Sequence, residues 1–201
     1  MKNILVITSS PRGEASHSSR VAKKLANDLE GHIVLRELWR EPLPPIDGHF
    51  VEAVFTPKDS RTEKHTAVLA QSDALITELL AADVLILAAG MINFGMPVAL
   101  KTWIDLITRA GVTFKFTESG PLGLVTGKQV ILVLASGGVY SEGPFARYNH
   151  LEPAVKDVLG FLGMTEIETV RVEGLNQGPE ATAKALEVAE RRTQDLVAAI
   201  A

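Results

Sequence analysis

The sequence predicts one doubly wound α/β domain over residues 1–201, with a five-stranded parallel sheet and helices on both of its faces. Five short apolar runs punctuate the chain, and stretches with helical spacing alternate with them. Three of the runs are nearly continuous Val, Ile and Leu, which is typical of strands buried on both faces.

The runs set the expected strands, which cover residues 3–9, 32–38, 83–89, 129–136 and 166–174. The expected helices between and after them cover residues 18–30, 63–81, 97–109, 151–162 and 179–200. In the first of these, Val21, Leu25 and Leu29 recur every four residues. The last opens at Pro179, directly after Gly178, which is a typical helix start.

Two stretches do not fit this alternation. Residues 39–61 hold four Pro and are expected to form a long irregular connection, and residues 111–127 are expected to form a small hairpin or excursion. Trp39, Phe50 and Phe55 give the first stretch too much apolar surface for a free loop. We therefore expect it to cover a site across a two-fold dimer.

Composition narrows the class of protein. The net charge is −4 and the basic residues are scattered, which argues against nucleic acid or an anionic membrane as partner. Without cysteine, disulfides and thiolate metal sites are excluded, and a reducing, cytoplasmic setting is expected. The first apolar run spans only about six residues, so it predicts a strand and not a signal peptide. No run approaches the roughly 18 apolar residues of a membrane helix.

The expected topology locates the ligand site. Open α/β sheets bind ligands at the carboxyl ends of their strands, where the strand order switches. With the order 2-1-3-4-5, that crevice is framed by the loops at 9–19, 90–97 and 136–144. All three loops are rich in Ser, Gly or Asn and lack the acidic cluster of a metal or phospho-acceptor site.

The first loop leads into a helix beginning near Ser16. Hydroxyls of Ser10, Ser16 and Ser18 and free N–H groups at the helix start suit a phosphate. In the simpler alternative, Ser16 only caps the helix. The loop is not a P-loop, and the absence of GxGxxG argues against a Rossmann dinucleotide site.

The second loop suits a flavin ring. Gly90 and Gly95 would let the backbone approach a flat ligand, Asn93 offers an amide, and Met91 and Phe94 offer apolar, polarizable surface. Alternatively, Met91 and Phe94 simply cover the end of the sheet.

The third loop repeats this pattern. Gly137 and Gly138 expose backbone N–H groups, and Tyr140 can stack or hydrogen bond. An ordinary turn is the alternative.

Residues 91–128 (MINFGMPVALKTWIDLITRAGVTFKFTESGPLGLVTGK) resemble the FMN-dependent NADH azoreductases, a family also described as quinone reductases. The resemblance extends from the N-terminal Ser-rich loop through LASGG at 134–138, GFLG at 160–163 and EGLNQGPE at 173–180. It implies a flavodoxin-like fold and a homodimer with one FMN bound per subunit at the interface.

The resemblance also implies FMN contacts on all three loops: Ser10, Ser16, His17 and Ser18 for the phosphate side, Met91, Ile92, Asn93 and Phe94 for the ring, and Ala135, Ser136, Gly137 and Gly138. It implies a substrate face lined by Phe116, Tyr140 and Phe161. Three positions depart from the family pattern: Ile92 replaces a frequent aromatic, Gly90 a common Pro, and Ser136 an Arg of some relatives. These departures are compatible with FMN binding, but they leave open which substrate and which nicotinamide the protein prefers.

The implied activity is two-electron reduction. NADH, with NADPH as the alternative donor, reduces the flavin and leaves, and a quinone or azo compound then takes the same place. Backbone N–H groups of 93–94 and 137–138 are expected to stabilise the reduced ring. Tyr140 and His150 are candidate proton donors, although His150 is better interpreted as a solvated loop residue.

Two other classes of protein share the expected topology. A flavodoxin-type electron carrier without its own substrate usually has a strongly acidic face, which the mild net charge does not favour. A phospho-acceptor signalling domain of the same topology would need acidic residues after the first and third strands, and these are absent.

Overall fold

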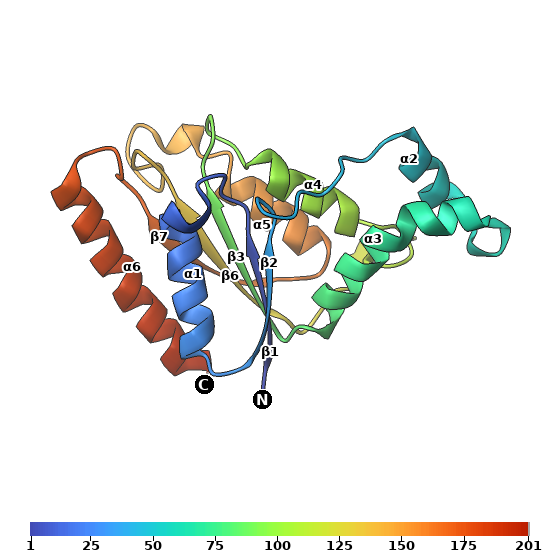
Figure 1. Ribbon diagram of the computed structural model, residues 1–201, viewed down its shortest axis with the longest axis horizontal. Helices are drawn as coiled ribbons and strands as arrows, with labels where there is room; N and C mark the ends of the chain where they lie inside the picture. The colour runs from blue at the N-terminus through green and yellow to red at the C-terminus, as the bar shows by residue number, and fades with distance from the viewer. Residues whose placement is uncertain (201) are drawn as a thin grey trace.

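The computed structural model describes residues 1–200 and contains a five-stranded parallel sheet (Figure 1). The strands, in spatial order, are β2 (His32–Glu37), β1 (Asn3–Thr8), β3 (Val84–Gly90), β6 (Gln129–Ala135) and β7 (Glu166–Val172). Counted along the chain within this sheet, the order is 2-1-3-4-5, so the expected topology is confirmed.

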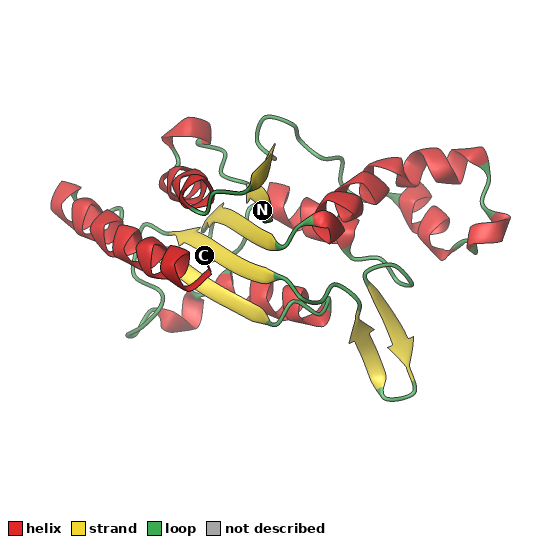
Figure 2. Ribbon diagram, turned by 90° about the horizontal axis from the view of Figure 1, so that it is seen from below, coloured by secondary structure: helices red, strands yellow, loops and turns green. Residues whose placement is uncertain are grey.

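Helices cover both faces of the sheet (Figure 2). The helices α1 (His17–Asp28) and α6 (Pro179–Ile200) pack on one face, and α3 (Glu63–Ala81), α4 (Val98–Ile107) and α5 (Glu152–Phe161) pack on the other. Strand β1 supplies both cores, because alternate side chains of a strand point to opposite faces. Ile4 and Val6 join the core under α1, whereas Leu5 and Ile7 join the other core.

The two stretches outside the alternation take different forms. Residues 111–127 contain the expected hairpin, formed by antiparallel strands β4 (Phe114–Thr117) and β5 (Gly120–Gly123). The expectation that 39–61 is wholly irregular is wrong, because it contains α2 (Gly48–Phe55). The side chain of Asp47 caps this helix by accepting the N–H of Phe50 at 2.8 Å.

The aromatic side chains of this connection are only partly exposed. Phe50 is buried in the core, and the ring of Trp39 packs so close to Gly13 that a Cβ there would lie 3.1 Å from it. Only Phe55, at 80% exposure, presents most of its surface to solvent. The chain itself covers Phe50 and part of Trp39, so Phe55 is the residue of these three with the most surface left for a partner. Helix α2 and the start of α3 form an arm that projects from the body in Figure 1.

The described residues contain no helix long and apolar enough to cross a membrane.

Candidate functional site

A cleft of about 220 Å³ lies at the carboxyl ends of β1, β3 and β6. Its lining comes from all three predicted loops and from the segment after β7: Ser10, Arg12, Ser16, His17, Ser18, Gly90, Met91, Ala135, Ser136, Gly137, Leu175 and Asn176. The structure therefore brings eight of the twelve implied cofactor contacts together in this cleft, and the other four, Ile92, Asn93, Phe94 and Gly138, do not line it. Arg12, Leu175 and Asn176 were not predicted from the sequence.

One end of the cleft is the N-terminus of α1. The hydroxyl of Ser16 accepts the N–H of Ser19 at 3.3 Å, so Ser16 is the helix cap. Its oxygen also lies 3.1 Å from that of Ser18. Within the described residues, the N–H groups of His17 and Ser18 donate no hydrogen bond. Free N–H groups, two hydroxyls and the helix dipole favour an anion at this end.

His17 is held in a defined state at the same end. Burial lowers the pKa of His17, and the guanidinium groups of Arg20 and Arg12 lower it further. Both effects favour the neutral imidazole. Its Nδ1 accepts a hydrogen bond from Arg20 Nη2 at 2.8 Å, which leaves Nε2–H as a donor. Arg12 lies in the Ser-rich loop of the sequence, and this position could have indicated a cation beside the predicted phosphate site.

The second loop makes a tight turn, in which the backbones of Ile92 and Gly95 exchange two hydrogen bonds of 3.0 Å. Asn93 and Phe94, between them, adopt left-handed backbone angles with φ of 46° and 70°. Non-glycine residues rarely do so, and such strain concentrates at functional sites. The left-handed residues of this turn are therefore Asn93 and Phe94, which the sequence did not predict. The N–H groups of Asn93 and Phe94 make no hydrogen bond within the described chain.

The third loop is packed against the segment that follows β7. The N–H groups of Leu175 and Asn176 donate to the carbonyls of Ser136 and Gly137 at 3.2 and 2.9 Å. A Cβ on Gly137 would fall 2.4 Å from Asn176 Nδ2, so only glycine permits this approach. The N–H groups of Gly137 and Gly138 donate no bond among the described residues.

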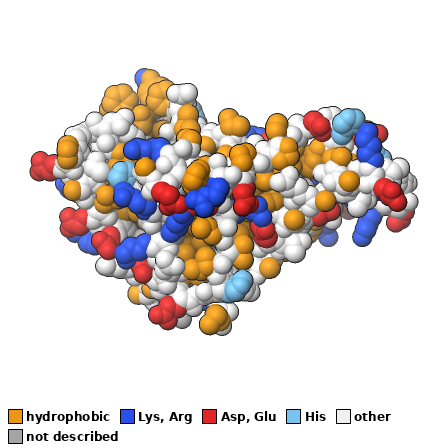
Figure 3. Space-filling model, in the orientation of Figure 1, with side chains coloured by type: hydrophobic (Ala, Val, Ile, Leu, Met, Phe, Trp, Pro, Cys, Tyr) orange, Lys and Arg blue, Asp and Glu red, His pale blue; other side chains and the backbone are white. Residues whose placement is uncertain are grey.

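An aromatic patch borders the cleft. It consists of Phe94, Tyr140, Phe145 and Tyr148, the last two of which were not predicted. Phe94 stacks on Tyr148 with centroids 5.1 Å apart and meets Tyr140 edge-on at 6.0 Å, while Phe145 stacks on Tyr148 at 6.4 Å. Figure 3 shows hydrophobic side chains gathered at the top of the molecule, over the loops that follow β3 and β6. This patch is an aromatic surface in which the ring of Tyr140 stands at 73° to that of Phe94.

Phe116 and Phe161 lie elsewhere. They pack around Phe114 on the hairpin and at the end of α5, with centroids 5.5 and 4.6 Å from its ring. Neither lines the cleft of its own chain. The implied substrate face of Phe116, Tyr140 and Phe161 is therefore not formed within one chain. His150 is an exposed loop residue whose N–H donates to the carbonyl of Phe94 at 3.0 Å.

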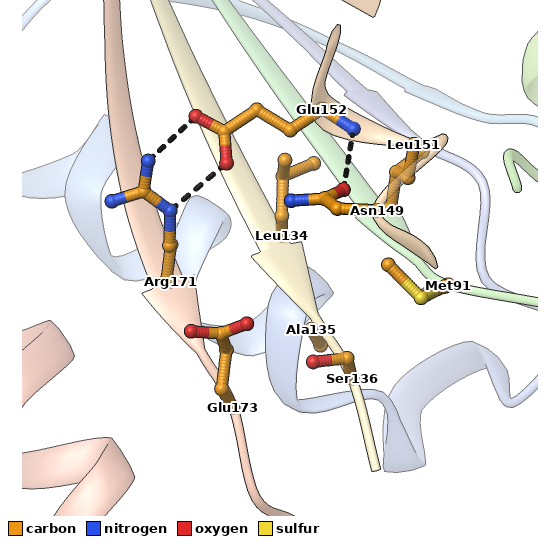
Figure 4. A pocket seen from close by; sticks show the side chains of 9 residues that line it. All are labelled: Met91, Leu134, Ala135, Ser136, Asn149, Leu151, Glu152, Arg171 and Glu173. Atoms are coloured by element: carbon orange, nitrogen blue, oxygen red, sulfur yellow. Dashed lines mark hydrogen bonds and ion pairs between the residues drawn. The ribbon is translucent and has the colours of Figure 1, made fainter. Parts of the chain in front are cut away.

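An ionic group centred on the buried carboxylate of Glu152 lies beside Met91, Ala135 and Ser136 of the cleft (Figure 4). The carboxylate of Glu152 accepts bonds from Arg171 Nε and Nη2 at 2.9 and 2.7 Å, and Lys156 Nζ lies 2.8 Å away. Burial alone would raise the pKa of Glu152, but the bonds from Arg171 and Lys156 lower it to about 2. The backbone N–H of Glu152 donates to the side chain of Asn149, which fixes the end of the third loop.

The doubly wound sheet has a cleft at the carboxyl ends of its strands, with an end that favours an anion and a free N–H group at Gly137, and these features define an α/β protein suited to a phosphorylated ligand. The sequence model for the flavodoxin-like fold matches residues 2–197. The chain is 51% identical to the FMN-dependent NADH:quinone oxidoreductase 1 of Rhizobium etli, over 99% of this chain and 100% of that protein. Identity to the FMN-dependent NADH:quinone oxidoreductase of Dechloromonas aromatica is 44%, over 97% and 99% of the two chains.

Among solved structures, an azoreductase from Bacillus anthracis strain Sterne superposes with a TM-score of 0.85 at 29% identity, covering 98% of this chain and 99% of that one. The chain belongs to the flavodoxin-like family of FMN-dependent NADH:quinone oxidoreductases. The family resemblance inferred from residues 91–128 is thereby confirmed.

Proposed function

We propose that this chain uses FMN to carry two electrons from NADH to quinones and azo compounds, which occupy one site in turn. The observation that carries the proposal is the cleft itself. It presents backbone N–H groups that no group of the described chain uses, both at the start of α1 and at Gly137.

The residues present fit FMN. Hydroxyls of Ser10, Ser16 and Ser18, with the guanidinium of Arg12, would hold the phosphate at the start of α1. The turns at 91–94 and 135–138 would hold the ring. When bound, FMN supplies the redox chemistry, accepting a hydride from the nicotinamide and delivering two electrons to the acceptor.

The protein contributes binding, orientation and electrostatics. Preorganised N–H groups at 93–94 and 137–138 favour negative charge placed against them, because they need no reorganisation when that charge develops. The aromatic patch offers stacking surface for a nicotinamide or quinone ring. No side chain is required as nucleophile, and Tyr140 and His150 are the candidate proton donors.

The proposed enzyme is a two-fold homodimer. Ile46, Val51 and Phe55 on the projecting arm are 43%, 44% and 80% exposed, and Phe116 on the hairpin is 75% exposed. Surfaces of this kind are typical of association. Neither Phe116 nor Phe161 lines the cleft of its own subunit. In a dimer, one subunit would place Phe116 or Phe161 against the cleft of the other. Sedimentation at micromolar concentration should give a dimer, and a monomer would remove this part of the proposal.

Steady-state NADH oxidation by the purified protein, with a quinone as sole acceptor, tests the activity. Turnover without any partner protein is expected, with NADPH and an azo dye as parallel assays. Oxidation that requires a second redox protein would instead indicate an electron carrier.

A further inference from the structure

The loop between β6 and α5 carries three of the four rings of the aromatic patch, Tyr140, Phe145 and Tyr148. Residues 141–145 of this loop are exposed, and the loop has no strand to hold it. A loop that presents apolar rings to solvent needs anchors to keep them in one arrangement. The structure shows two such anchors, one at each end of the loop.

The anchor at the far end is built from backbone groups and an amide. The N–H of His150 donates to the carbonyl of Phe94, and the N–H of Glu152 donates to Asn149 Oδ1 at 3.2 Å. These bonds tie the end of the loop to the turn at 92–95 and to the start of α5. They involve no charged side chain.

The anchor at the near end is the carboxylate of Glu173, which directly follows β7. Its Oε1 accepts the N–H groups of Tyr140 and Ser141 at 2.7 and 3.0 Å, and its Oε2 accepts the hydroxyl of Ser141. Hydrogen bonds to an ionised acceptor are stronger than neutral ones. Figure 4 shows Glu173 on the same segment as Arg171, close to Ser136.

This anchor is separate from the bonds that shape the cleft. Residues 136–138 are held by backbone bonds from Gly174, Leu175 and Asn176, none of which uses the Glu173 side chain. Asn149 Nδ2 also donates to the carbonyl of Tyr140 at 3.4 Å, so loss of the carboxylate should loosen Tyr140 and Ser141 without freeing them, and should leave the proposed FMN contacts in place.

We propose that Glu173 is a positioning residue for the electron acceptor. Its carboxylate fixes Tyr140 edge-on to Phe94, and this sets the aromatic patch in the arrangement that receives a planar acceptor. The inference rests on the proposed function, because it assigns the aromatic patch to acceptor binding.

The test compares Glu173→Ala and Glu173→Gln with wild type, all loaded with FMN. Glu142→Gln is the matched control, since Glu142 is an exposed carboxylate of the same loop for which the structure shows no hydrogen bond or ion pair. Hydrogen exchange of the peptide covering residues 139–142 reports the anchor directly. Steady-state kinetics with a 1,4-naphthoquinone and with ferricyanide separate a planar acceptor from one that needs no stacking.

In Glu173→Ala, exchange at Tyr140 and Ser141 should rise, and KM for the naphthoquinone should rise about tenfold because charge-assisted bonds are lost. Glu173→Gln keeps one acceptor oxygen and should give an intermediate KM. The kcat with ferricyanide, FMN affinity and the melting temperature should change little, and Glu142→Gln should match wild type.

Unchanged exchange in Glu173→Ala would overturn the anchor, and equal changes with both acceptors would overturn the acceptor role. A wild-type protein that fails to reduce quinones would overturn the proposed function, and with it this inference. An active wild type with normal Glu173 variants would overturn the inference alone.

Discussion

The hydroxyl oxygens of Ser16 and Ser18 lie 3.1 Å apart at the N-terminus of α1. Ser16 caps the helix through the N–H of Ser19, and both hydroxyls line the cleft. The two interpretations of this loop, as a cap and as a phosphate site, are therefore compatible. They still predict different effects of substitution.

Ser18→Ala removes one hydroxyl from the proposed phosphate end and leaves the cap in place. FMN affinity should fall about tenfold, because a hydrogen bond to a charged group is worth about 1.5–3 kcal/mol. Fluorescence titration of apo protein with FMN and with riboflavin measures this. Riboflavin lacks the phosphate and should bind nearly unchanged, whereas equal losses for both ligands would rule out the phosphate role.

Replacing Ser16 separates the cap from the anion site. Asp caps a helix as well as Ser does, so Ser16→Asp should melt like wild type but bind FMN more weakly through charge repulsion. Ser16→Ala should lose about 0.5–2 kcal/mol of stability. Thermal melts of both apo variants, with FMN titrations, give the two effects independently. Normal FMN binding by Ser16→Asp would mean that no phosphate sits there.

One site that serves donor and acceptor in turn predicts substitution kinetics. Double-reciprocal plots of rate against NADH, at several fixed quinone concentrations, should be parallel lines. The reason is that the first product leaves before the second substrate enters. Intersecting lines would mean that both substrates bind together, which contradicts a single shared surface.

The Glu152 ion pairs predict a pH-dependent contribution to stability. Burial raises the pKa of Glu152, but Arg171 and Lys156 outweigh it and bring the pKa from 4.5 to about 2. Because the folded pKa is the lower one, the stabilisation is fully present above about pH 4.5 and is lost as pH falls toward 2. Glu152→Gln should therefore cost about 1–3 kcal/mol at pH 7.

Urea unfolding of wild type and Glu152→Gln at pH 7 and at pH 3 tests this contribution. The difference in free energy of unfolding between the two proteins should be smaller at pH 3 than at pH 7. The exposed Glu166, on the same strand as Arg171, supplies the control substitution Glu166→Gln. If the free energy of unfolding of Glu152→Gln stays below that of wild type by the same amount at both pH values, packing and not charge is responsible.

The sheet could be predicted from the sequence because its signal is local. Continuous apolar runs identify buried strands, and helical spacing between them implies parallel crossovers. Helix α2 was missed because four prolines in 39–61 suggested an irregular segment. Three of these prolines lie before residue 46, and the helix begins only after them, with Asp47 as its N-cap.

The site was predictable only in part, because some of its contacts depend on tertiary register. The topology placed the loops after β1, β3 and β6 together, and the structure confirms this arrangement. The proximity of Asn176 to Gly137 depends on how β7 pairs with β6, which residue types do not reveal. The strain at Asn93 and Phe94 is likewise set by the two backbone bonds between Ile92 and Gly95, which residue types do not reveal.

The identity of the bound cofactor tests the central claim most directly. The purified protein, heat-denatured after reconstitution with an equimolar mixture of FMN, FAD and riboflavin, releases whatever its cleft selects. We expect a yellow protein that releases FMN at about one molecule per chain, since the cleft combines a phosphate end with a ring end. Release of FAD, or equal retention of riboflavin, would contradict a phosphate-specific mononucleotide site at the N-terminus of α1.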